Sequence, residues 1–398
     1  MSESTTIGER LRRLRGERGL TQAELAERAG VSTDVVRKLE QGVRQSARVT
    51  SLRRLAQALG VNMSGLMDKR PRLEGAADTV NLLAVRDVLL SPSMLPGIDP
   101  DDAGEATPAA DLAAAVRAAW EDYWGGQFGR LAGTLPGLIG EARLTARLTG
   151  AAAAAPLAQV YQLAACLFVH MGWEDLATIA AERGVNAAAQ GSDELQWATL
   201  HGTYSWVLLA QARLDEAERH AVRVAERVEP TLSSATPEHL TAWGALLLTA
   251  VAPAAAAGRA AEVGEYISLA GAGAALLTAD RHDYQTNFGP TQVAMQATHG
   301  YTVLGHPRRA LDAAKLVRRE DLRPISWGRH LLDVAQSQVV SRRDEAALGT
   351  LRTAHTVAPE WFRHQPPARE IVAELIERRR RLTPALRSLA RAVELAAN

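Results

Sequence analysis

The chain has 398 residues, and its 45 Lys and Arg balance its 45 Asp and Glu. A single cysteine, Cys166, excludes an intrachain disulfide framework, suits a reducing compartment, and is expected to be a small core residue. No apolar stretch of membrane-spanning length is apparent, and the start MSESTTIGERLRR lacks the apolar core of a secretion signal. We therefore expect a cytoplasmic protein without a membrane partner.

Residues 20–42, LTQAELAERAGVSTDVVRKLEQG, predict two short helices joined by a tight turn. Thr21 and Glu24 have the spacing of a capping box, which would start the first helix. Gly30 can adopt a positive φ and end it, and Ser32 offers a hydroxyl cap to the second helix. A turn of this size leaves the second helix projecting, as a helix-turn-helix requires for entry into the major groove of DNA.

Amphipathic patterns flank this motif on both sides. One apolar face precedes it, and another follows it and ends at Gly60; their residues are Ile7, Leu11, Leu14, Leu52, Leu55, Ala56 and Leu59. Asn62 begins a possible short fifth helix. Five helices in about seventy residues would bury a small but sufficient core, so we expect a first domain over 1–72.

The neutral total charge hides an uneven distribution. Residues 1–72 contain 15 Lys and Arg against 8 Asp and Glu, a net charge of +7, and the remainder carries −7. A charge excess is often only a solvated surface. On a helix-turn-helix, it indicates contact with phosphates.

Residues 7–67 resemble the five-helix DNA-binding domain of phage repressors and Cro, the XRE family. The resemblance is carried by G-L-T-Q-x-E-L-A, A-G-V-S, L-E-x-G and L-x-x-L-A-x-A-L-G-V, which are nearly complete here. It implies an all-α, lambda-repressor-like domain that binds double-stranded DNA.

The resemblance also implies roles for individual residues. Gln22 would hold a phosphate, and the recognition helix would present base-reading side chains with one exposed arginine beside them. Two arginines after that helix are candidate phosphate contacts. The implied DNA-binding set is Gln22, Thr33, Asp34, Arg37, Lys38, Arg44 and Arg48.

Two acidic residues of this region need separate interpretations. Asp34 replaces the Gln often found in phage repressors, and phosphate repels a carboxylate. It would therefore either accept from cytosine N4 or cap its own helix, and capping is favoured. Arg15 and Glu40 match a buried ion pair of relatives, for which a stabilising role is preferred to a role in recognition.

The rest of the chain reads as helix after helix, without the alternating β-branched runs of strands. Residues 73–108 are expected to be a linker with one possible connecting helix over 78–90. Paired helices follow, and a last helix or two is expected over 368–396. The pairs are 109–125 with 128–149, 157–171 with 173–189, 193–211 with 214–228, 237–257 with 259–278, 284–304 with 307–319, and 325–340 with 343–357.

This period of paired helices predicts an α-solenoid of degenerate tetratricopeptide (TPR) type over 109–398. Such a fold exposes a concave face lined mainly by the first helix of each pair. Aromatic and polar residues recur on successive first helices, and each is either core or part of a shared pocket. The candidate effector-binding residues are Trp197, His201, Tyr204, Trp243, Phe288, Gln292, Gln296, His299, Trp327 and His330.

Three segments carry a second resemblance. Asn287-Phe288-Gly289-Pro290-Thr291-Gln292-Val293, the run over 329–333 and the A-P-E at 358–360 are similar to segments of actinobacterial helix-turn-helix regulators with helical-repeat C-termini. The alternative interpretation of Pro290 is that it starts a helix at the first helical position. The resemblance implies a regulatory role and leaves the signal open.

These observations predict a transcriptional regulator that binds an inverted-repeat operator as a homodimer. Its repeat domain would dimerise and sense a small molecule or a peptide. The alternative is an interaction protein, whose solenoid binds a protein partner while the helix-turn-helix localises it to DNA. A closed aromatic pocket would favour a small molecule, and an open charged groove a polypeptide. No nucleophile, phosphate loop or metal-spaced cluster is visible, so we expect no enzyme activity, cofactor or metal.

Overall fold

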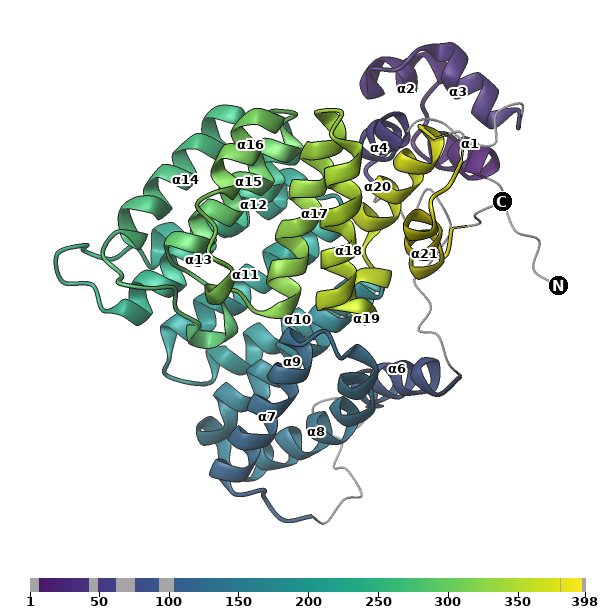
Figure 1. Ribbon diagram of the computed structural model, residues 1–398. Coiled ribbons are helices and arrows are strands. Elements are labelled where there is room, and N and C mark those ends of the chain that lie inside the picture. The colour runs from purple at the N-terminus through teal and green to yellow at the C-terminus, as the bar shows by residue number, and fades with distance from the viewer. Residues whose placement is uncertain (1–6, 43–48, 62–75, 93–103, 380, 396–398) are drawn as a thin grey trace.

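The computed structural model describes residues 7–42, 49–61, 76–92, 104–379 and 381–395. Within these ranges the chain is helical, apart from turns, loops and one isolated antiparallel bridge between Arg281 and Phe288. Figure 1 shows a small group of helices beside a larger helical array. The predicted all-α fold class is therefore confirmed.

The small group, which we call the head, contains four described helices. They are α1 (Ile7–Glu17), α2 (Gln22–Ala29), α3 (Thr33–Glu40) and α4 (Val49–Ala58). The two predicted apolar faces meet around α2 and α3 in a core cluster of the head's own residues. The predicted fifth helix at Asn62 lies outside the described residues.

The larger array, which we call the body, begins with α6 (Ala76–Leu89), at the place of the predicted connecting helix. Its apolar side joins the body core through Leu82, Val85 and Leu89. Six helix pairs follow, close to their predicted bounds: α7 (Ala109–Trp124) with α8 (Phe128–Thr149), α9 (Ala154–His170) with α10 (Glu174–Ala189), α11 (Glu194–Ala210) with α12 (Leu214–Arg227), α13 (Pro237–Ala256) with α14 (Ala260–Ala274), α15 (Pro290–Val303) with α16 (Pro307–Ala314), and α17 (Pro324–Val340) with α18 (Asp344–Val357). The last described helices are α19 (Pro359–Arg363), α20 (Pro366–Glu377) and α21 (Pro384–Ala392).

The same turn joins the two helices of every pair. Each turn contains one residue with φ between 60° and 78°, the left-handed conformation that favours glycine. Four of these residues are glycine, and the other two are Ala212 and Arg342. This shared geometry gives the repeat its regularity, although the sequence lacks a strict repeat consensus.

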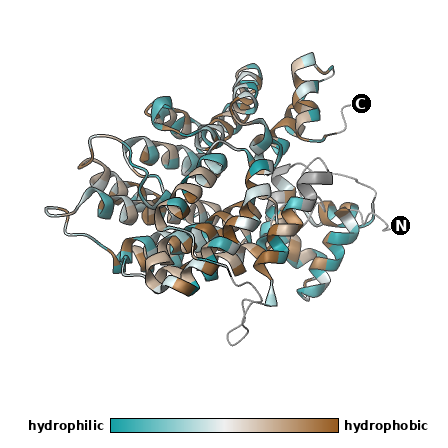
Figure 2. Cartoon of the chain, turned by 90° about the horizontal axis from the view of Figure 1, so that it is seen from below, coloured by the Kyte–Doolittle hydropathy of each residue, from teal (hydrophilic) through white to brown (hydrophobic). Residues whose placement is uncertain are grey.

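The body closes on itself, because its first and last helix pairs are in contact. Arg323, which precedes α17, donates to Glu121 of α7 over 2.8 Å. A Cβ added at Gly126, in the turn after α7, would lie 3.3 Å from Cβ of Trp361 on α19. One core cluster combines side chains of α6–α11 with side chains of α17–α21. The colouring in Figure 2 places hydrophobic residues where the helices pack together.

Two stretches of the body, Phe128–His170 and Pro237–Ala256, are long and apolar enough to cross a membrane by length and composition. The expectation that no stretch has this length was therefore wrong. Their most apolar windows are 67% and 78% buried inside the body. A helix surrounded by other helices is apolar on all sides, which explains their composition.

Candidate functional site

The helix-turn-helix of the head is built as its sequence predicts. Thr21 and Glu24 form both bonds of the capping box, and Gly30 ends α2 with φ 59°. Val36 and Leu39 of α3 are buried in the head core, while Thr33 and Arg37 on its other side are exposed. The recognition helix is thus anchored by one face and presents the other to solvent.

The structure shows the Asp34 carboxylate in a third arrangement, paired with basic residues of its own helix. Its carboxylate pairs with Arg37 Nη2 at 2.5 Å and with Lys38 Nζ at 2.6 Å. Hydrogen bonds from Lys38 and then Arg37 lower the pKa of Asp34 below its usual range. The predicted cap of α3 is also absent, because the Ser32 side chain makes no capping hydrogen bond. The three charged residues of the outer face are therefore paired with one another in the absence of DNA.

The predicted pair of Arg15 and Glu40 is present and bidentate. Arg15 Nε and Nη2 lie 2.7 and 2.9 Å from the two carboxylate oxygens of Glu40, whose side chain is 3% exposed. Burial opposes ionisation, but hydrogen bonds from Arg15 and Gln22 lower the pKa of Glu40 on balance. Gln22 Nε2 donates to Glu40 over 2.8 Å, so this one carboxylate ties together α1, α2 and α3. Arg44 and Arg48 lie outside the described residues.

A cavity of about 180 Å³ lies in the body, where all six first helices meet. This arrangement is the concave face that the solenoid predicted. The contact between the first and last pairs narrows it, and the cavity stays partly open to solvent, where Arg329 is exposed. Part of the wall is aromatic, with side chains from α7, α11 and α19. These are Trp120, Tyr123, Trp124, Trp206 and Trp361.

The polar part of the cavity wall contains several amides and one charged group. Gln162 of α9 donates from Nε2 to Thr203 Oγ1 over 2.9 Å, and Gln292 and Gln296 of α15 also line the cavity. Arg329 of α17 also lines the cavity, and its guanidinium lies 5.7 Å from the ring centroid of Trp206. Within the described residues, no aspartate or glutamate lines the cavity.

Only Gln292 and Gln296, of the ten predicted effector-binding residues, line this cavity. On α11, the predicted face turns the other way. His201 Nδ1 lies 2.9 Å from His220 Nε2 of α12, and the guanidinium of Arg227 lies 4.5 Å from the ring centroid of Trp197. Tyr204 donates to Glu182 of α10 over 3.4 Å. The side of α11 that lines the cavity instead carries Thr199, Gly202, Thr203 and Trp206.

The remaining predicted aromatic and histidine residues are part of the packing between helices. Trp243 and Phe288 are buried in one core cluster. Only glycine fits at position 244, because an added Cβ would lie 2.1 Å from the Phe288 ring. His299 Nδ1 lies 3.0 Å from Asp333 Oδ1. The two others, Trp327 and His330, stack on each other. The core alternative therefore holds for Trp243 and Phe288, and none of these five side chains lines the cavity.

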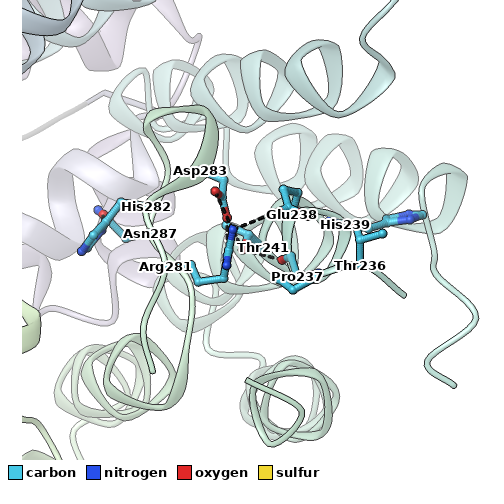
Figure 3. Close-up of polar contacts among 9 residues, drawn as sticks. All are labelled: Thr236, Pro237, Glu238, His239, Thr241, Arg281, His282, Asp283 and Asn287. Carbon is cyan, nitrogen blue, oxygen red and sulfur yellow. Dashed lines mark hydrogen bonds and ion pairs between the residues drawn. The ribbon is translucent and has the colours of Figure 1, made fainter. Parts of the chain in front are cut away.

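The segment over 287–293 belongs to a tight loop beside the cavity and to the start of α15. Figure 3 shows Arg281 bridging Asp283 and Glu238, with distances of 2.7 and 2.6 Å. Pro290 starts α15 as predicted, and Asp280 accepts hydrogen bonds from the backbone N–H groups of the next two residues. The loop thereby holds Gln285, Thr286 and Asn287 at the cavity wall.

The aromatic residues of the cavity that sequence reasoning missed come mainly from α7, with one more from the other side of α11 and one from α19. Trp120 and Trp124 are one helical turn apart, and with Tyr123 they form a cluster of rings 5.0 to 6.1 Å apart. This density of aromatic residues in α7 was a usable signal. However, α7 lies far in sequence from the helices in which effector-binding residues were predicted. Among the described residues, no group of three His, Cys, Asp or Glu side chains is placed to hold a metal ion.

Comparisons with known proteins match the head. Residues 6–65 match the family model described as a helix-turn-helix domain. The transcriptional repressor RghR of Bacillus subtilis is 39% identical over 69 residues, which are 17% of this chain and 51% of RghR. SinR of the same organism is 30% identical over 87 residues, 21% of this chain and 78% of SinR. A regulator of Sinorhizobium fredii, y4dJ, is 46% identical over 56 residues, 14% of this chain and 71% of y4dJ.

The helix-turn-helix with its charged outer face and these matches define a class. The chain belongs to the HTH-type transcriptional regulators. It spans about half the length of RghR, and the matches to these three relatives leave most of the body uncovered.

Two solved structures match most of the chain at low similarity. One is PlcR of Bacillus thuringiensis in complex with the peptide PapR7 and DNA, at 13% identity and a TM-score of 0.29, covering 79% of this chain and all of that one. The other is a mutant of PrgX, at 13% identity and a TM-score of 0.33, covering 85% of this chain and all of that one.

Proposed function

We propose that this regulator binds an inverted-repeat operator as a homodimer in the cytoplasm, and that its DNA affinity is set by an effector bound in the central cavity. The observation that carries the proposal is the meeting of all six first helices at one cavity. An occupant there would contact every repeat at once, so it would favour one arrangement of the body over another.

The head supplies the DNA contacts in this proposal. Thr33, Asp34, Arg37 and Lys38 lie on the outer side of α3, where a recognition helix presents its base-reading groups. Gln22, Arg44 and Arg48 remain proposed phosphate contacts. Because one small head buries little surface, two heads related by a two-fold axis would read half-sites about 34 Å apart or a multiple of it.

The body supplies the dimer contact and the sensor. A ligand shifts an equilibrium only by its differential affinity for the two forms, so a coupling of about 1–3 kcal/mol is the expected scale. The aromatic, nearly uncharged wall favours a small molecule over an extended polypeptide. It also favours sensing over the scaffold alternative, for which a charged groove is expected.

The test compares two variants of a glycine on the cavity wall. A Cβ at Gly202 would make only ordinary contacts, 3.5 Å from Leu246 and 3.9 Å from Thr249, so Gly202→Ala should behave as the wild type. Gly202→Phe should fill the cavity and remove the response of operator binding to cell extract, with effector-free DNA affinity retained. An unchanged response in a folded Gly202→Phe protein would exclude the cavity as the sensor.

Oligomeric state is tested separately by light scattering and by the footprint on DNA. We expect a dimer with two protected half-sites. A monomer with a single protected half-site would overturn that part of the proposal.

A further inference from the structure

Three buried polar atoms in the cavity wall have no hydrogen-bond partner. They are Nε1 of Trp120, Oε1 of Gln162 and Nε2 of Gln292, on side chains that are 1%, 3% and 3% exposed. Buried polar groups are normally satisfied, so each of these positions calls for an occupant with a matching group. Trp120 and Gln292 offer donors, and Gln162 offers an acceptor. A complementary occupant would therefore carry acceptors for the first two and one donor for Gln162.

The charge of the wall selects the sign of the occupant. Arg329 is the one ionised side chain on the wall among the described residues, and no acid accompanies it there. Among the described residues, Arg329 forms no ion pair. Its guanidinium lies near the Trp206 ring instead. His170 is also in the wall, and burial holds its pKa well below the usual value, so it is neutral. A site with one unpaired cation and no anion favours a monoanion.

The size and composition of the wall limit the body of the occupant. A cavity of about 150 Å³ in another protein holds benzene, so the 180 Å³ available here accommodates roughly one substituted ring. Five aromatic side chains line the space, and flat rings pack against such walls by stacking and edge-to-face contacts. This volume sets the size of the part of the occupant that lies inside the cavity.

We propose that the occupant is a small aromatic carboxylate, a single ring that also bears one hydroxyl or amino donor. Arg329 pairs with the carboxylate. The unpartnered atoms of Trp120, Gln162 and Gln292 satisfy its remaining polar groups, and the indole rings hold the ring. This inference rests on the proposed function, in which the cavity holds the effector, and adds the chemical class of that effector.

The first experiment measures binding to the full chain by titration calorimetry and by the shift of the denaturation midpoint. The probes are single-ring aromatic acids such as 4-hydroxybenzoate and 4-aminobenzoate, each beside its neutral amide, with 4-hydroxycyclohexanecarboxylate as the non-aromatic counterpart. At least one acid should bind at least tenfold tighter than its amide and than the non-aromatic acid. Equal affinity for acid and amide, or no binding by any acid, would overturn the inference.

The second experiment assigns the charge preference to Arg329. Arg329→Gln should remove the difference between acid and amide. The matched control is Arg352→Gln, because Arg352 is an exposed arginine of α18 outside the cavity wall, and it should keep the difference. Retention of the preference in a folded Arg329→Gln protein would also overturn the inference.

The failure of this inference can be told apart from failure of the proposed function. If neutral rings or short peptides bind instead, and Gly202→Phe abolishes that binding, the cavity is a sensor and the proposed ligand class is wrong. If Gly202→Phe leaves both binding and the response of operator affinity unchanged, the sensor itself lies elsewhere.

Discussion

Gln57 of the head donates a hydrogen bond from its side-chain amide to the carbonyl oxygen of Ala256, at the end of α13, over 2.6 Å. The same helix lines the central cavity with Ala242, Ala245 and Leu246. The contact therefore joins the DNA-binding part of the chain to a wall of the cavity. Such a bond is worth about 0.5–1.5 kcal/mol, enough to change an equilibrium between two head positions roughly 2- to 12-fold.

The first prediction uses this contact. Cysteines at Gln57 and Ala256, joined by a short bismaleimide in the full chain, should cross-link in high yield and reduce the effect of ligand on operator affinity. Cys166 should not react, because burial raises its thiol pKa to about 12. Either single variant is the control. If the double variant cross-links no better than the single variants, the head does not contact the end of α13.

The second prediction concerns the paired charges on the recognition helix. Asp34→Asn should strengthen binding to every DNA sequence and steepen its salt dependence, since Arg37 and Lys38 lose the carboxylate that holds them in the free protein. Lys38→Ala should instead lower discrimination at one base step, by about 1–3 kcal/mol.

Fluorescence anisotropy with operator and unrelated duplexes, at several salt concentrations, measures both effects. The matched control is Glu17→Gln, which removes a carboxylate paired with Arg13 on α1. Weaker binding by Asp34→Asn to all sequences would show that Asp34 contributes favourably at the DNA surface.

The third prediction concerns the carboxylate that joins three head helices. Glu40→Ala should destabilise the head by on the order of 2 kcal/mol, below the value for a fully buried pair because Arg15 remains 17% exposed. Glu40→Gln keeps the shape and should destabilise it less. Thermal denaturation of the head checks this, and an unchanged melting temperature for Glu40→Ala would show that the pair contributes nothing.

The fourth prediction follows from the turns of the body. Ala212 and Arg342 have φ values of 61° and 60°, so replacing either by Gly should stabilise the body by about 1 kcal/mol. Ala118→Gly, at an exposed position inside α7, should destabilise it by a similar amount. Chemical denaturation measures all three, and destabilisation by both turn variants would contradict the proposed strain.

The fifth prediction concerns pH. Burial and then Arg363 lower the pKa of His364 to about 4, so the unfolded chain, with a pKa near 6.5, binds the proton first as pH falls. The stability that neutral His364 contributes is complete above about pH 6.5 and is lost progressively as pH falls towards 4, at roughly 1.4 kcal/mol per pH unit.

Unfolding free energies between pH 7 and 5 test this dependence. His364→Gln should reduce the slope by about one proton, and His306→Gln, at an exposed position, should leave it unchanged. Equal slopes for the wild type and His364→Gln would contradict the prediction.

Much of this architecture is readable from the sequence, since helix bounds depend on local caps, periodicity and turns. The capping box at Thr21 and the left-handed Gly30 are local, and both were predicted. The start of α15 at Pro290 agrees with one of the interpretations of that proline, although the helix was expected from residue 284. The orientation of each helix about its own axis is not local. On α11, sequence singled out Trp197, whereas the cavity is lined by Thr203 and Trp206 on another face, because the closure of the body decides which face turns inward.

The partners of charged groups were likewise harder to predict than their positions. Asp34 satisfies its carboxylate with Arg37 and Lys38, one helical turn away, and both were considered only as contacts of DNA. The recognition helix therefore has internal ion pairs that must be exchanged for phosphate or base contacts on binding.

The contact between Gly126 and Trp361 also affects the order in which the head and the body can fold during synthesis. A ribosome adds about 5–20 residues per second, so on the order of 10 to 50 s separate the emergence of these two residues. The head can fold during that interval, because its core uses only its own side chains. The first helix pairs of the body can complete their packing only after the last helices have been synthesised. Chains terminated early would keep a folded head but lack both the complete cavity and the dimer contact proposed for the body, so they would bind DNA weakly and would not respond to an effector.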